Sequence, residues 1–136
     1  MQNLIITLGA SAGGLHPLEA FLKSVGSEPK ASFVIIQHLS PDYKSLMPEL
    51  LKKTTPMPVH VVEPDMPIEA KQVYLIPPRQ TMTIVNGRFK LTAEEAEKSP
   101  INIFMRSAAE SYGDRAIGII FSGTGSDGTE GASAIR

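Results

Sequence analysis

Apolar residues in this chain fall into short runs separated by polar and glycine-rich segments. Runs rich in Val and Ile, apolar on successive positions, occupy 4–8, 33–37, 59–62, 72–76 and 116–121. Such runs are typical of strands that are buried on both faces of a parallel sheet. Helices are predicted between them, over 17–25, 45–53 and 100–112. This alternation predicts an α/β fold in which helices cover a mostly parallel sheet.

A turn signal adds one antiparallel feature to this pattern. The segments 81–85 and 88–92 flank Asn86-Gly87, which predicts a β-hairpin insertion with a two-residue turn. Right-handed crossovers lead us to expect the first three strands in the order 3-2-1, with later strands on the other side of strand 1. The expected architecture is therefore three-layered and doubly wound. Its topological switch point, where open α/β sheets bind ligands, lies at the carboxyl end of strand 1.

Composition narrows the functional classes. A chain of 136 residues fits one domain. Thirteen Lys and Arg against 14 Asp and Glu give a net charge of -1, which argues against nucleic acid or a polybasic membrane anchor as partner. The absence of cysteine excludes disulfides and a Cys nucleophile, and the three histidines are too scattered to suggest a metal site. No cofactor is expected. No run has the length of a membrane span and no signal peptide is evident, so we expect a cytoplasmic domain.

The turn after the first strand is the first candidate for chemistry. Gly9 to Gly13 fits G-x-S-x-G, a sharp strand-to-helix turn that exposes the Ser11 hydroxyl and makes the Ala12 amide an oxyanion donor. Glycine-rich turns also bind phosphate. A dinucleotide fingerprint would, however, need glycine at position 11, where serine stands. The turn by itself leaves the nucleophile and the phosphate-loop interpretations open.

Two further polar residues follow strands of the same sheet. His38 directly follows the second strand and is well placed as a general base, although a strand-end histidine can be purely structural. Asp127 lies in the glycine-rich loop after the last strand. It could orient the imidazole, with the Thr124 amide as a second oxyanion donor, although Asp before Gly is also common turn chemistry. Because parallel strands end at one edge, we expect Ser11, His38 and Asp127 to converge.

The remaining histidines and two other acids compete poorly for these roles. We expect His16, at the mouth of the first helix, to point outward, and His60, early in its strand, to lie toward the opposite edge of the sheet. Asp42 and Asp65 stand in ordinary proline-containing turns.

Four segments together resemble one family. GASAGG, FVIIQHLSPDYKSLMPELL, VYLIPP and AIGIIFSGTGSDGTEGA are similar to the catalytic domain of CheB, the protein-glutamate methylesterase of bacterial chemotaxis, and the resemblance covers essentially the whole chain. It implies a serine hydrolase with Ser11 as nucleophile, His38 as base and Asp127 as orienting acid. Family members remove methyl esters from chemoreceptor glutamates, releasing methanol, and many deamidate receptor glutamines. The GTG of this chain replaces the GMG of some members, with little expected effect.

The resemblance also bears on domain organisation and partners. The familiar architecture places a receiver domain first, whereas this chain starts at strand 1, as do stand-alone forms and fusions with a CheR-type methyltransferase and sensor domains. The family domain continues for several dozen residues, so we expect 1–136 to be a catalytic domain truncated at its C-terminus. The expected partner is a methyl-accepting chemoreceptor. The alternatives are a non-catalytic signalling module that binds a nucleotide, and an esterase with a different protein substrate.

Overall fold

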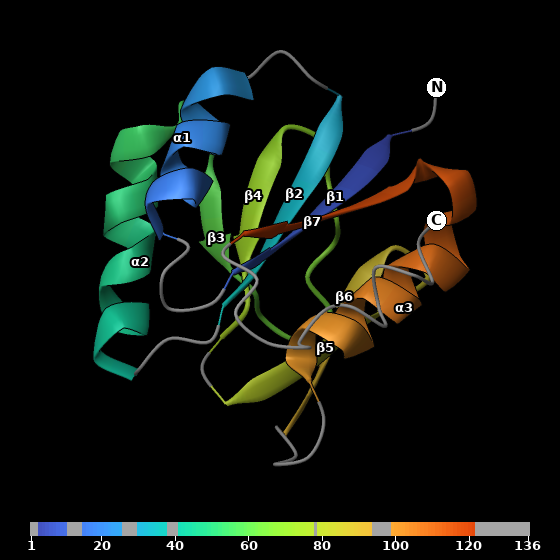
Figure 1. Ribbon diagram of the computed structural model, residues 1–136. Helices are drawn as coiled ribbons and strands as arrows, with labels where there is room; N and C mark the ends of the chain where they lie inside the picture. The colour runs from blue at the N-terminus through green and yellow to red at the C-terminus, as the bar shows by residue number, and fades with distance from the viewer. Residues whose placement is uncertain are drawn as a thin grey trace.

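A computed structural model describes residues 3–10, 15–25, 30–37, 41–77, 79–93 and 99–121; at 15, 16, 37 and 41–47 it describes the backbone only. The elements alternate along the chain as expected (Figure 1). They are β1 (Leu4–Ala10), α1 (Leu15–Val25), β2 (Ala31–Gln37), α2 (Pro41–Thr54), β3 (Val59–Val61), β4 (Gln72–Leu75), β5 (Gln80–Val85), β6 (Arg88–Ala93), α3 (Pro100–Tyr112), a 3₁₀ turn η2 (Gly113–Arg115) and β7 (Ala116–Phe121).

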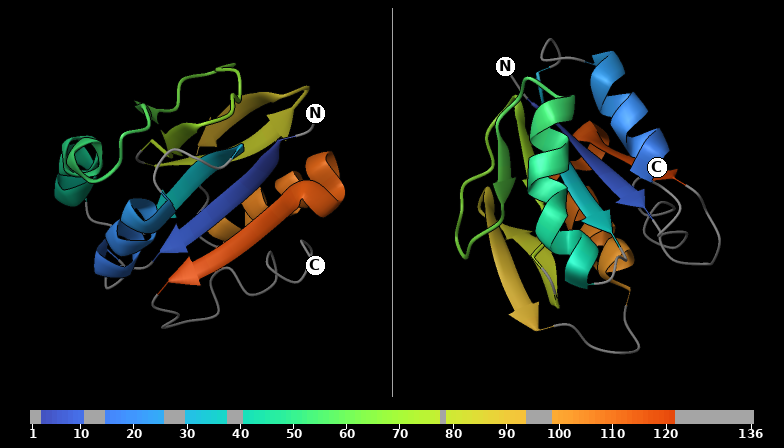
Figure 2. Two further views of the ribbon diagram at one scale, coloured as in Figure 1. Left: turned by 90° about the horizontal axis from the view of Figure 1, so that it is seen from above. Right: turned by 90° about the vertical axis from the view of Figure 1, so that its left-hand side faces the viewer.

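The central sheet is parallel and has helices on both sides. Its strand order is β3-β4-β2-β1-β7, and every described pairing within it is parallel. One face carries α1 and α2, and the other carries α3 together with the antiparallel β5–β6 hairpin (Figure 2). The three-layer α/β fold with a hairpin insertion is therefore confirmed.

The expected order, 3-2-1 with all later strands beyond strand 1, is wrong for β4, which inserts between β2 and β3. Burial gives the physical reason. Val73, Tyr74 and Leu75 of β4 are all buried, whereas the three residues of β3 are half-buried or exposed. The more apolar strand takes the interior position and the short, partly polar strand takes the edge. β7 lies beyond β1 as expected, and within the described residues it is the outer strand on that side.

Four strands of the sheet, β1, β2, β4 and β7, divide their side chains between two cores. In β1, Ile5 packs into the core under α3 and the hairpin, while Ile6 and Leu8 pack into the core under α1 and α2. This split follows from the alternation of side chains along a strand. It explains why the strand sequences are continuously apolar, since both faces are covered.

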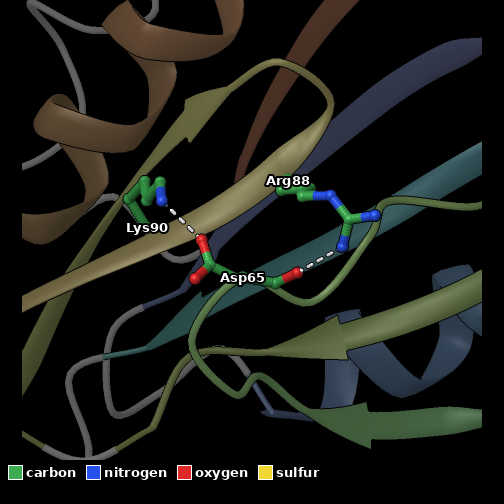
Figure 3. A network of polar contacts seen from close by, with 3 residues as sticks. All are labelled: Asp65, Arg88 and Lys90. Carbon is green, nitrogen blue, oxygen red and sulfur yellow. Dashed lines mark hydrogen bonds and ion pairs between the residues drawn. The ribbon is translucent and has the colours of Figure 1, made fainter.

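The β5–β6 hairpin is held to the rest of the domain through β6, as well as through its tight turn. Asn86 and Gly87 both have positive φ, at 52° and 74°, as a type I′ turn requires. The loop after β3 pairs with β6 through the backbone, with Asp65 N donating to Phe89 O at 3.0 Å. Figure 3 shows the side-chain part of this contact, in which Lys90 pairs with the Asp65 carboxylate and Arg88 Nη1 donates to the Asp65 carbonyl at 2.8 Å. The loop thereby covers the free edge of β6.

Candidate active site

The carboxyl ends of β1, β2 and β7 lie side by side at one level of the sheet. Ala10, the last residue of β1, is in register with Gln37 at the end of β2 and with Phe121 at the end of β7. The arrowheads of the three strands point to the same side of the molecule (Figure 2). We call this side, where the parallel strands end, the carboxyl edge. Neighbouring strands are about 4.8 Å apart, so three chain segments leave the sheet within about 10 Å of one another.

Each of these segments leads into a predicted site residue. Ser11 directly follows β1 and His38 directly follows β2, while Asp127 comes six residues after the end of β7. These three residues, and the amides of Ala12 and Thr124, lie outside the described residues. The structure thus confirms that the strands before them end together, and the Ser-His-Asp triad itself stays a prediction.

The carboxyl end of β1 is tightly packed on the face that α3 covers. A Cβ atom on Gly9 would lie 3.0 Å from Ile101 Cγ2, 3.2 Å from Ile101 Cδ1 and 3.0 Å from Ile120 Cδ1. Those distances are shorter than the ordinary carbon–carbon contact of about 3.5–4.0 Å. Glycine at position 9 therefore lets the first turn of α3 rest directly on the β1 backbone. The sequence analysis did not predict this contact. The glycine at position 9 was the one feature of the sequence that indicated a close approach to the β1 backbone.

The first turn of α3 is itself well defined. Ser99 is the N-cap, and its Oγ accepts a hydrogen bond from Asn102 N at 3.1 Å. Pro100 occupies the start of the helix, where its fixed φ is favourable and its missing N–H costs nothing. Ile101 is 2% exposed. The helix therefore begins at a fixed point beside the carboxyl edge.

The competing residues lie elsewhere, as far as their side chains are described. His60 is in β3, separated from β1 by β4 and β2; its Nε2 lies 2.5 Å from Gln72 Oε1 and its ring stacks on Tyr74. Asp65 pairs with Lys90, which holds the pKa of that carboxyl below its ordinary value. Both residues therefore have structural partners away from the strand ends that precede the predicted triad.

The side chains of His16 and Asp42 lie outside the described set. His16 stands in the first turn of α1 and Asp42 in the first turn of α2. Among the described residues, no group of three or more His, Asp or Glu side chains is placed to hold a metal ion. None of the helices in this part of the chain is both long and apolar enough to cross a membrane.

Comparison with known proteins decides the family. A family model described as CheB methylesterase matches residues 6–136. The chain belongs to the CheB methylesterase family. The catalytic domain of CheB methylesterase from Thermotoga maritima has the same fold, with a TM-score of 0.84 at 24% identity, over 99% of this chain and 75% of that one. The expected CheB-type fold is confirmed.

Curated relatives of this CheB-family chain are considerably longer than the chain itself. It is 33% identical over 135 residues to protein-glutamate methylesterase/protein-glutamine glutaminase 3 of Paramagnetospirillum magneticum, covering 96% of this chain and 38% of the relative. The protein-glutamate methylesterase/protein-glutamine glutaminase of group 3 operon of Pseudomonas putida is 29% identical over 136 residues, covering 97% of this chain and 40% of that protein. An uncharacterised 104.1 kDa protein of Rhodobacter capsulatus is 41% identical over 92 residues, which are 66% of this chain and 10% of that protein. The chain thus spans about two fifths of the length of the named methylesterases.

Proposed function

We propose that this protein is a serine hydrolase that removes methyl esters from glutamate side chains of a chemoreceptor. The observation that carries the proposal is the shared level at which β1, β2 and β7 end. The segments that follow these ends contain Ser11, His38 and Asp127, in a chain whose relatives are named protein-glutamate methylesterases. The nucleophile, the base and the orienting acid of a serine hydrolase would then all come from segments that leave the sheet at its carboxyl edge.

The proposed reaction has two steps. His38 takes the Ser11 proton as Ser11 Oγ bonds to the ester carbonyl carbon, and the carbon–methoxy bond then breaks as His38 protonates the leaving oxygen, which departs as methanol. Water repeats the sequence on the glutamyl-enzyme and releases glutamate. The Ala12 and Thr124 amides hold the oxyanion, each supplying about 2.7–4 kcal/mol. With a glutamine side chain, the same steps would release ammonia.

We propose that 1–136 is a CheB-type catalytic domain and acts in the cytoplasm in signal adaptation. The 104.1 kDa relative, of which the aligned region forms 10%, supports a place for such a domain within a much larger polypeptide, for example beside a CheR-type methyltransferase or sensor domains.

The test is methanol release from a methylated receptor fragment, together with acylation by a small ester. Ser11→Ala should abolish both, whereas Ser24→Ala should change neither, because Ser24 is exposed on α1 and its Oγ donates only to Phe21 O. Asp127→Asn should lower kcat by about 10⁴-fold, since the imidazole would lose its orienting acid. Full activity in Ser11→Ala would refute the assignment.

Two alternatives have distinct outcomes in the same experiment. Saturable nucleotide binding without acylation would identify a non-catalytic binding module at the switch point. Acylation by a small ester without methanol release from receptor would identify an esterase with a different protein substrate.

A further inference from the structure

We propose that Ile101 is a positioning residue for the Ser11 nucleophile, a role that rests on the proposed function. Gly9 stands two residues before Ser11, and the Cγ2 and Cδ1 methyls of Ile101 lie within 3.2 Å of the place where a Gly9 side chain would begin. Any shift of Ile101 toward or away from the sheet therefore acts directly on the β1 backbone just before the nucleophile.

The support at Gly9 matters because the sheet ends one residue later. Ladder pairing fixes β1 as far as Ala10, which is in register with both of its neighbours. Side chains alternate along a strand, so Ile5, Thr7 and position 9 face α3, while Ala10 faces the α1 side. Among the described residues, Ile101 and Ile120 are thus the side chains that pack on the α3 face of β1 at Gly9, two residues before Ser11.

The helix that carries Ile101 is anchored firmly enough to serve as a reference point. The Ser99 cap and Pro100 define its first turn, and Phe104 and Met105 are both fully buried in the same core. Ile120, at the register position beside Gly9 in β7, places its Cδ1 against the same face of Gly9. The end of β1 is therefore held by a capped helix and a paired strand.

The experiment compares Ile101→Ala with Met105→Ala. Both side chains are buried, at 2% and 0% exposure, and Met105 lies one helical turn, about 6 Å, further from the carboxyl edge. With a small ester as substrate, Ile101→Ala should lower kcat by about 10- to 100-fold with KM little changed, because misplacement by about 1 Å has an effect of this size. Met105→Ala should lower the unfolding midpoint comparably and leave kcat within about twofold.

Two further measurements keep the test decisive. Ile101→Val removes only Cδ1 and should give a folded protein with an intermediate kcat. Amide hydrogen exchange at Gly9 and Ala10 should be faster in Ile101→Ala than in Met105→Ala, whatever the catalytic activity.

The outcomes separate the two proposals. A wild-type protein that acylates no ester at all would refute the proposed function, while the exchange comparison would still decide whether Ile101 holds the end of β1. Equal losses of kcat in Ile101→Ala and Met105→Ala, or equal exchange at Gly9 and Ala10 in the two variants, would overturn the positioning role.

Discussion

Thr7 should limit the stability of this fold, and its replacement by valine should raise it. Thr7 lies in the middle of β1, between Val34 of β2 and Gly118 of β7, and is fully buried. Its hydroxyl has no hydrogen-bond partner, the one such buried side-chain group in the described part of the chain. Valine has nearly the same shape and replaces this hydroxyl with a methyl group.

The expected gain follows from the cost of a buried, unpaired hydroxyl. Mutational data place that cost at about 1–3 kcal/mol, and burial of the added methyl contributes about 0.8 kcal/mol. Both terms favour the variant, so Thr7→Val should raise the free energy of unfolding by at least about 1 kcal/mol. For a chain of this size, that corresponds to a melting temperature about 3–5 °C higher.

Ser107 supplies a comparison of opposite sign. Its hydroxyl is also buried on the α3 side, but its Oγ accepts a hydrogen bond from Ile84 N at 2.8 Å. This bond gives the backbone amide of Ile84, in β5, a partner. Ser107→Ala would leave that amide unpaired, and it should lower the free energy of unfolding by about 1–3 kcal/mol. The sign of the effect thus depends on the partner of the hydroxyl and not on its burial.

Urea unfolding followed by circular dichroism measures these differences, and an unchanged denaturant slope confirms that stability alone has changed. Thr7→Ser is the control. It keeps the unpaired hydroxyl and loses a methyl, so its midpoint should fall below that of the wild type. A lower midpoint for Thr7→Val, or shifts of the same sign for Thr7→Val and Ser107→Ala, would refute the reasoning.

Two other substitutions test the packing and the titration of the core. Gly9→Ala should destabilise the fold by about 1–3 kcal/mol through overpacking, and Ile101→Val should relieve part of this loss; unfolding midpoints of both single variants and the double variant would show additivity if the contact were unimportant. Tyr74→Phe should cost about 1–3 kcal/mol at neutral pH, because Tyr74 Oη accepts from Glu69 N at 2.8 Å and donates to Pro67 O at 3.2 Å. Burial raises the pKa of Tyr74 above its ordinary 10.0, so the stability that its protonated form contributes is present below pH 10 and is lost as the pH rises beyond it. Midpoints of wild type and Tyr74→Phe should therefore converge above pH 10, and a gap that widens there would contradict the assignment.

Local signals in the sequence determined the elements. The helix predicted over 100–112 is α3, Pro100–Tyr112, because a capping serine and a proline mark its start and Gly113, with a φ of 56°, marks its end. Asn86-Gly87 determined the hairpin for a similar reason, since these two residues tolerate positive φ. The convergence of the ends of β1, β2 and β7 was also predictable, because crossover connections make the strands parallel.

Only the tertiary structure decided which elements touch. Crossover handedness does not specify strand adjacency, and competition for the buried interior placed β4 between β2 and β3. The contact of Ile101 with Gly9 and the hydrogen bond from Ile84 to Ser107 join residues far apart in the chain. Periodicity reports which face of an element is apolar, but not which partner covers it. The site follows the same division: the motifs around Ser11, His38 and Asp127 are local, whereas the support beneath the end of β1 comes from the packing of α3 against the sheet.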